Sequence, residues 1–118
     1  MRIIRFAATL ALAGALAACG GGATPAPAAV ELTLIASEFA FDPNAVEATA
    51  GSEVKFTLAN KGTIEHDITI DSVEFVLYAA VGETTTATTA ALAAGTYDFY
   101  CSIPGHKEAG MIGTLTVK

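Results

Sequence analysis

The strongest restriction on the fold of this chain is the alternation of apolar and polar residues from position 30 onward. Val54, Phe56 and Leu58, for example, alternate with charged or polar neighbours. Successive side chains of a β-strand point to opposite faces of a sheet, so a period of two predicts strands with one buried face. Such runs occupy residues 30–34, 54–58, 64–70, 73–78, 96–101 and 111–117.

Turn-forming residues separate these runs, at positions 42–44, 50–52, 60–62, 81–83 and 94–95. Short strands spaced about ten residues apart with such turns predict an antiparallel sandwich or barrel. The threonine-rich residues 84–89 fit an exposed strand better than a patch of O-glycosylation. No segment of this region has a convincing helical period. We therefore expect residues 30–118 to form one all-β domain.

The N-terminal residues 1–18 predict a secretory signal peptide. Arg2 and Arg5 supply its positive charge, and residues 6–18 form an apolar run. This run is shorter than the ~20 apolar residues that a membrane-spanning helix needs. Its length suits the apolar part of a signal peptide. We therefore expect residues 1–18 to be removed.

A cysteine and a segment rich in glycine, proline and alanine follow the signal peptide. The sequence Leu-Ala-Ala-Cys at residues 16–19 resembles the bacterial lipobox, whose cysteine sulfur carries a diacylglycerol. The alternative is ordinary signal cleavage, with Cys19 an incidental thiol. We expect a lipid on Cys19 and a flexible tether at residues 19–29. The protein would then be anchored to a membrane in the periplasm or at the cell surface.

Composition limits the classes of function. The chain has 12 acidic residues against 6 basic ones and a formal net charge of -6, which argues against nucleic-acid binding. Nothing in the sequence demands an assembly, so we expect a monomer. If Cys19 is lipidated, Cys101 has no disulfide partner within the chain. An unpaired thiol in an oxidising compartment suggests metal binding.

Four side chains that can bind a soft or borderline metal ion lie in two places. Cys101, His106 and Met111 form a Cys-x4-His-x4-Met run between two predicted strands, and His66 lies in an earlier one. His66 has the parity of Ile64 and of the later isoleucines, and Cys101 and Met111 also share parity with apolar neighbours. A buried imidazole or thiol destabilises the fold unless a partner satisfies it. A metal ion would be such a partner.

The chemistry of these side chains favours copper. Two imidazoles, one thiolate and one thioether suit an ion that cycles between Cu(I) and Cu(II). Zinc rarely uses methionine, and iron–sulfur clusters need more thiolates. A dinuclear copper centre would need a second cysteine in the loop. The sequence therefore predicts one copper ion.

Two segments resemble the cupredoxins, small blue copper proteins of the plastocyanin and azurin group. They are residues 60–67, with sequence Asn-Lys-Gly-Thr-Ile-Glu-His-Asp, and residues 95–117 around the Cys-x4-His-x4-Met run. The spacing of this run is similar to that of auracyanins. The resemblance covers roughly residues 30–118 and implies a Greek-key β-sandwich with the metal under one end.

The resemblance also implies a set of ligands and a function. His66, Cys101 and His106 would surround the copper ion, and Met111 would be a weak axial ligand. Members of this family transfer single electrons between redox partners, such as cytochromes or oxidases, outside the cytoplasmic membrane, and are not enzymes. Many relatives carry asparagine after the first histidine, where this chain has Asp67.

Asp67 is expected to act around the metal in three ways. Its backbone N–H would donate to the Cys101 sulfur, and its carboxylate would accept a hydrogen bond from Ser102, joining the two ligand-bearing segments. Ionised near the metal, the carboxylate would favour the oxidised state and lower the reduction potential.

Two other functions compete with electron transfer. A copper-binding module could deliver or sequester the ion, although such proteins usually display exposed runs of methionine or histidine, which this chain lacks. An enzyme could use Cys101 as nucleophile and His106 as base, but this needs an accessible thiolate and an orienting group. Nothing else in the sequence supports an enzyme.

Overall fold

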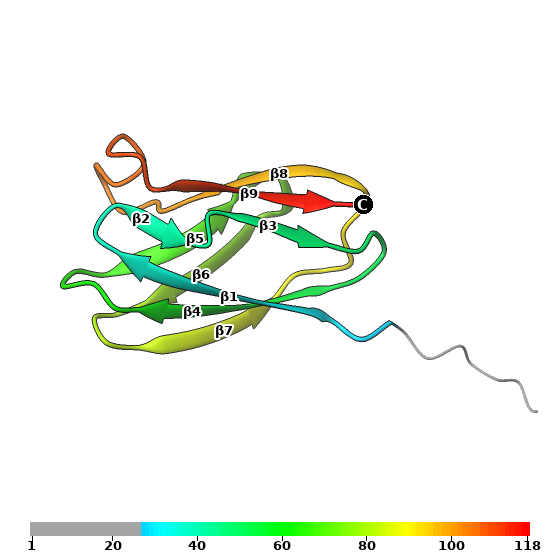
Figure 1. Ribbon diagram of the computed structural model, residues 1–118, viewed down its shortest axis with the longest axis horizontal. Helices are drawn as coiled ribbons and strands as arrows, with labels where there is room; N and C mark the ends of the chain where they lie inside the picture. Colours follow the sequence, from blue (N-terminus) through cyan, green and yellow to red (C-terminus); the bar gives the residue numbers. More distant parts are fainter. Residues whose placement is uncertain (1–26) are drawn as a thin grey trace, which may run out of the picture.

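The computed structural model describes residues 27–118 as a sandwich of two β-sheets (Figure 1). One sheet has the strand order β2-β1-β4-β7, and the other has the order β3-β9-β8-β5-β6. A short 3-10 turn, η1, joins β5 to β6. The bounds are β1 Val30–Ser37, β2 Ala40–Asp42, β3 Ala45–Ala48, β4 Val54–Asn60, β5 His66–Ile70, η1 Asp71–Val73, β6 Phe75–Ala79, β7 Thr84–Thr88, β8 Gly95–Tyr100 and β9 Ile112–Val117. The predicted all-β Greek-key sandwich is confirmed.

Two strand pairs differ from the antiparallel arrangement that the pattern predicted. β1 runs parallel to β4, and β3 runs parallel to β9. After β1 the chain turns back along β2, continues into β3 of the other sheet, and turns again before β4. Two reversals restore the original direction, so β4 lies parallel to β1. Alternation along a strand predicts its faces and carries no information about its partner.

The predicted strand at residues 64–70 begins later than expected. β5 starts at His66, and Ile64, which was placed on the core face, is 37% exposed in the preceding loop. The side-chain amide of Asn60 donates to the Ile64 carbonyl (2.8 Å), which fixes the backbone there. The predicted run 73–78 likewise starts late, because residues 71–73 form η1. The short strands β2 and β3 were not predicted as separate strands.

The core lies between the two sheets and reaches up to the end that carries the candidate ligands. Phe56 and Phe99 are fully buried, and each packs against a second aromatic ring. Fully burying a side chain of this kind stabilises the fold by ~1.5–3 kcal/mol. β5 is buried along its whole length, because it lies between β8 and β6 inside its sheet.

Three connections gather at one end of the sandwich (Figure 1). They are the β1–β2 turn (residues 37–40), the β4–β5 loop (residues 61–65) and the β8–β9 loop (residues 101–111). The chain enters β1 and leaves β9 at the opposite end. Every predicted ligand in the domain therefore belongs to the end opposite the point where the chain enters β1.

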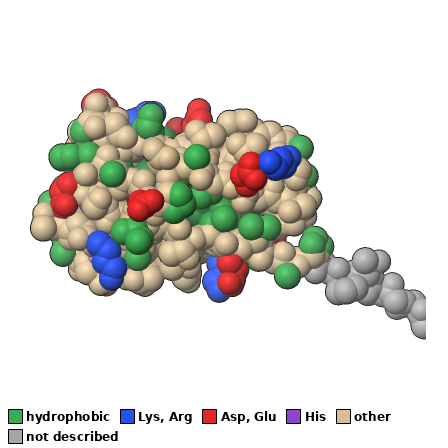
Figure 2. All heavy atoms as spheres, viewed as in Figure 1, with side chains coloured by type: hydrophobic (Ala, Val, Ile, Leu, Met, Phe, Trp, Pro, Cys, Tyr) green, Lys and Arg blue, Asp and Glu red, His purple; other side chains and the backbone are tan. Residues whose placement is uncertain are grey.

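The predicted signal peptide, Cys19 and most of the tether lie outside the described residues. Within residues 27–118, no helix is long and apolar enough to cross a membrane. On the face shown in Figure 2, basic and acidic side chains touch at two places, and the other charged side chains are scattered among polar and apolar ones. The described residues form two such ion pairs, Lys55–Glu31 and Lys118–Glu47.

Candidate metal centre

Three of the four predicted ligands meet beneath the end of the sandwich. The ligand atoms of His66, Cys101 and His106 all lie within 4.8 Å of one another. Nδ1 of His66 is 3.9 Å from Sγ of Cys101, and Nδ1 of His106 is 3.4 Å from the same sulfur. His66 and Cys101 are fully buried, and His106 is 6% exposed. The arrangement presents two ring nitrogens and one sulfur to a common point.

His66 is positioned by the start of β5 and by the loop before it. As the first residue of β5, His66 pairs with Ala79 of β6. Asn60, at the end of β4, is buried and binds the β4–β5 loop with its side chain. Its amide nitrogen donates to the carbonyls of Ile64 (2.8 Å) and Ala79 (3.1 Å), and its oxygen accepts from the Gly62 N–H (2.9 Å). These bonds fix the backbone that leads into His66.

The β8–β9 loop positions the other candidate ligands through its own main chain. The N–H of His106 donates to Ile103, the N–H of Met111 donates to His106, and the N–H of Cys101 donates to Met111, all at 3.0–3.1 Å. Gly105 adopts a φ of 84°, which favours glycine because it has no Cβ. Met111 is fully buried immediately before β9. The loop therefore holds its three candidate ligands in one hydrogen-bonded unit.

Asp67 joins the two ligand-bearing segments. Its backbone N–H donates to Sγ of Cys101 at 3.4 Å. Its carboxylate accepts hydrogen bonds from the Ser102 backbone N–H (2.7 Å) and the Ser102 hydroxyl, and also from Thr69 (3.3 Å). Both hydrogen-bonded links expected from the sequence are present. The sulfur thus receives a hydrogen bond from the strand that carries the first histidine.

Burial controls the protonation of the candidate ligands. It raises the pKa of the Cys101 thiol, with the hydrogen bond from the Asp67 backbone acting in the opposite direction. Burial also lowers the pKa of His66, and the nearby His106 lowers it further. The metal-free site is therefore expected to hold a neutral His66 and a protonated thiol at neutral pH. Binding of a metal cation to the sulfur would release the thiol proton.

The sequence of the chain matches one family along most of its length. The family described as "Cupredoxin-like domain" matches residues 6–117. The chain belongs to the cupredoxin-like family. A curated relative, the copper-resistant cuproprotein CopI of Rubrivivax gelatinosus, is 31% identical over 98 residues, which are 66% of this chain and 59% of that protein. The chain thus spans less than two thirds of that relative's length.

Solved structures share the cupredoxin fold of this chain. Reduced auracyanin from the photosynthetic bacterium Roseiflexus castenholzii is 24% identical with a TM-score of 0.68, covering 77% of this chain and 98% of that one. Auracyanin A from Chloroflexus aurantiacus, a "blue" copper protein, is 23% identical with a TM-score of 0.61, covering 75% and 99%. At these identities the likeness concerns the fold. The predicted similarity to auracyanins is confirmed at that level.

The residues at the end of this cupredoxin are compatible with a single copper ion. Both histidines turn Nδ1 toward the sulfur, and Nε2 of His66 is a buried polar atom with no hydrogen-bond partner among the described residues. An imidazole with one ring nitrogen on a metal keeps its proton on the other. Nitrogen and sulfur donors in this combination suit copper.

The β1–β2 turn contributes two residues that sequence reasoning missed. The ring of Phe39 packs edge-on against the ring of His106, with centroids 5.2 Å apart. Glu38 accepts hydrogen bonds from the backbone N–H and the hydroxyl of Thr63, in the β4–β5 loop. Phe39 adopts a φ of 60°. No local sequence signal marks these contacts, because the partners lie far apart in the chain.

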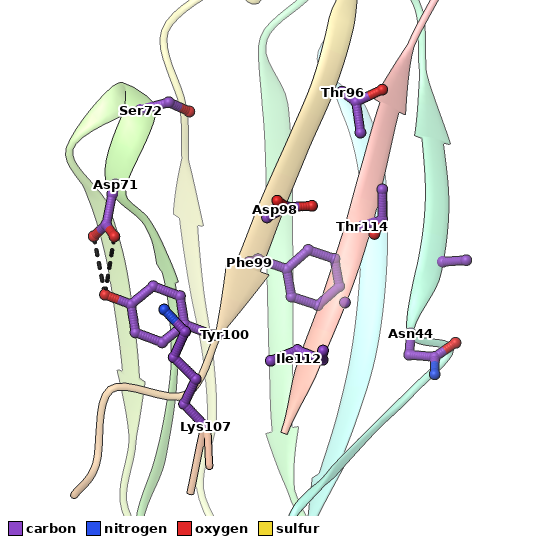
Figure 3. A pocket seen from close by; sticks show the side chains of 12 residues that line it. Asn44, Asp71, Ser72, Thr96, Asp98, Phe99, Tyr100, Lys107, Ile112 and Thr114 are labelled. Atoms are coloured by element: carbon purple, nitrogen blue, oxygen red, sulfur yellow. Dashed lines mark hydrogen bonds between the residues drawn. The ribbon is translucent and has the colours of Figure 1, made fainter. Parts of the chain in front are cut away.

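A separate hollow of about 750 Å³ lies on the outer face of the sheet that contains β8 and β9 (Figure 3). The Tyr100 hydroxyl donates there to both carboxylate oxygens of Asp71 (3.0 and 3.1 Å), and Lys107 Nζ lies 4.0 Å from the centre of the Tyr100 ring. The hydrogen bond to Asp71 raises the pKa of Tyr100. None of the three clustered candidate ligands lines this hollow, so it is distinct from the metal centre.

Proposed function

We propose that this cupredoxin is a one-electron carrier whose single copper ion is held by His66, Cys101, His106 and Met111. The observation that carries the proposal is the convergence of both Nδ1 atoms on the buried Cys101 sulfur. In this assignment the two imidazoles and the thiolate would be the strong ligands. Met111 is buried and its backbone bonds to His106 and Cys101, and its thioether would be the fourth, weaker donor to the ion.

Copper, when bound, supplies the one-electron redox chemistry, and the chain's own residues make the transfer easy. The hydrogen bond from the Asp67 backbone stabilises negative charge on the Cys101 sulfur. The Asp67–Ser102 hydrogen bonds hold β5 and the β8–β9 loop together. A site held this firmly changes little between oxidation states, so little reorganisation opposes electron transfer. Burial of the ligands excludes water from the sulfur.

The proposal extends to location and partners. We propose that residues 1–18 are a signal peptide, and that a lipid on Cys19 anchors a monomer in the periplasm or at the cell surface. The candidate metal centre lies at the end opposite the point where the chain enters β1, and would then face away from the anchor. Loss of Arg2 and Arg5 with the signal peptide changes the net charge from -6 to -8, which favours a redox partner, such as a cytochrome or an oxidase, with a basic docking face.

A second function is favoured by one comparison. The relative named copper-resistant cuproprotein CopI shares 31% identity with this chain, and copper delivery or sequestration would fit a role in resistance. An enzymatic role for Cys101 is disfavoured. Its thiol is fully buried and burial raises its pKa, whereas a nucleophilic cysteine needs an accessible thiolate.

The decisive experiment adds copper(II) to the purified apoprotein and records its visible spectrum. A thiolate bound to copper(II) gives an intense blue charge-transfer band, and Cys101→Ser should abolish it. A protein that binds copper without this band would contradict the carrier proposal. A blue protein that exchanges electrons slowly with every tested partner, yet passes copper to an apo-acceptor, would favour delivery.

Substitution of the weak ligand tests the role of Met111. Met111→Leu should keep the blue band and raise the reduction potential, because copper(II) loses a donor. We expect a rise on the order of 50 mV, equivalent to about 1 kcal/mol for one electron. The potential is measured by spectroelectrochemical titration. A colourless variant would show that Met111 contributes more to the site than one weak bond to copper.

A further inference from the structure

The two ring nitrogens of His66 have different surroundings. Nδ1 faces Sγ of Cys101 at 3.9 Å, whereas Nε2 is buried and has no hydrogen-bond partner among the described residues. An unpaired buried polar atom of this kind destabilises a fold by ~1–3 kcal/mol. In metal-bound histidines the second nitrogen almost always donates to a carboxylate, a carbonyl or water. Nε2 therefore requires an acceptor once Nδ1 binds copper.

The carboxylate of Glu38 lies on the same side of Gly62 as this nitrogen. A Cβ atom on residue 62 would be 2.7 Å from Oε1 of Glu38 and 2.8 Å from Nε2 of His66. Only glycine leaves room for both groups. Among the acidic side chains that raise the pKa of His66, Glu38 acts most strongly. Its carboxylate is therefore well placed to act on His66.

Glu38 is also fixed in place. The backbone N–H and the hydroxyl of Thr63 both donate to Oε1 of Glu38. These bonds lower the pKa of Glu38, so its side chain carries a negative charge at neutral pH. Oε2 takes part in neither bond and is available as an acceptor. A charged acceptor thus stands beside the unpaired nitrogen, anchored to the loop that leads into His66.

We propose that Glu38 accepts a hydrogen bond from Nε2–H of His66 and is a positioning residue of the copper site. The inference rests on the proposed function, because copper on Nδ1 keeps the ring proton on Nε2. The carboxylate then fixes the imidazole plane and makes Nδ1 a stronger donor. Its negative charge favours copper(II) over copper(I), which lowers the reduction potential.

The test compares the wild-type protein with Glu38→Gln. The glutamine oxygen can still accept from Thr63, so slow hydrogen exchange at the Thr63 amide should persist in the apoprotein. We expect the preference for copper(II) over copper(I) to fall about tenfold, which raises the potential by about 59 mV. In the diamagnetic copper(I) protein, the Nε2–H proton of His66 should move upfield in the NMR spectrum, because a neutral amide is a weaker acceptor.

Glu65→Gln is the matched control, since it removes one exposed charge from the residue next to His66. It should leave the Nε2–H resonance in place and move the potential much less. Equal shifts of the potential in both variants would show that Glu38 acts only as a distant negative charge, which would overturn the inference. An unmoved Nε2–H signal in Glu38→Gln would overturn it as well. A wild-type protein that binds copper(I) but forms no blue copper(II) state would overturn the proposed function. The NMR comparison in the copper(I) protein would still show whether Glu38 accepts a hydrogen bond from His66. Failure to bind copper would overturn both.

Discussion

The two loops that supply the candidate ligands are stabilised in opposite ways. Side chains outside the loop fix the β4–β5 loop before His66, namely Asn60 at the end of β4 and Glu38, which lies 25 positions from Thr63 in sequence. The β8–β9 loop is held mainly by hydrogen bonds between its own backbone groups, and Asp67 of β5 binds only its first two residues. One half of the site therefore depends on the packing of the whole sandwich, and the other half on a short local sequence.

The largest effect on this comparison is expected from Asn60→Ala. The substitution removes three hydrogen bonds to backbone groups of the β4–β5 loop and β6. At about 1 kcal/mol for each bond, the free energy of unfolding of the apoprotein should fall by about 3 kcal/mol. Urea denaturation measures it. Asn44→Ala, at an exposed position, should change it by less than ~0.5 kcal/mol. A loss below ~1 kcal/mol at Asn60 would show that this loop is also self-supporting.

Two glycine substitutions sharpen the contrast between the loops. Gly62→Ala would push a methyl group against Glu38 and His66, whereas a Cβ on Gly105 meets no atom within 4 Å but would sit at a φ of 84°. We expect Gly62→Ala to destabilise the apoprotein by about 2 kcal/mol through overpacking and Gly105→Ala by about 1 kcal/mol through backbone strain.

The same two variants should differ more in their affinity for copper(II) than in their free energy of unfolding. Gly62→Ala moves the His66 imidazole and should weaken copper(II) binding about tenfold. Gly105→Ala should leave the affinity close to that of the wild type, because it adds no contact. Competition with a chelator of known affinity measures both. Equal losses of affinity would mean that the β8–β9 loop also transmits strain to the metal centre.

This difference between the loops explains which parts of the molecule could be predicted. The Cys-x4-His-x4-Met run is a local signal, and its residues hydrogen-bond to one another. Cys101, His106 and Met111 could therefore be predicted from their spacing. The buried face of each strand could be predicted from the alternation of apolar and polar residues, which placed His66 on the buried face of its strand. The links of Asp67 to the sulfur and to Ser102 followed from the family resemblance.

The remaining features depend on contacts between distant segments. Alternation does not specify strand partners, and so the parallel pairing of β1 with β4 was not foreseen. The β1–β2 turn shows no motif, yet it brings Glu38 to the β4–β5 loop and Phe39 to His106. Ile64 was misplaced because Asn60, whose amide also binds Ala79 of β6 19 positions away, holds its carbonyl outside β5. These features arise only when the sandwich closes.

Asp67→Asn tests the link between the two halves of the site. Asparagine can still accept from the Ser102 backbone, and its amide can donate to the Ser102 hydroxyl, so the segments stay joined. The negative charge is lost, which should raise the reduction potential by tens of millivolts, on the order of 1 kcal/mol. Redox titration across neutral pH measures the change. An unchanged potential would show that the carboxylate serves only to hold β5 against the loop.

The smallest expected effect is a difference in how the two halves respond to pH in the apoprotein. The pKa values of His66 and Glu38 are lowered from 6.5 and 4.5, so the unfolded chain binds more protons and the free energy of unfolding falls as the pH drops below these values. The pKa of Cys101 is raised from 9.0, so stability is lost as the pH rises above that value.

Urea midpoints measured across this pH range should form a plateau between an acid limb and an alkaline limb, in both of which the midpoint falls. Glu38→Gln should reduce only the acid limb and Cys101→Ser only the alkaline one. If either substitution altered the opposite limb, the two halves of the site would be coupled even without metal.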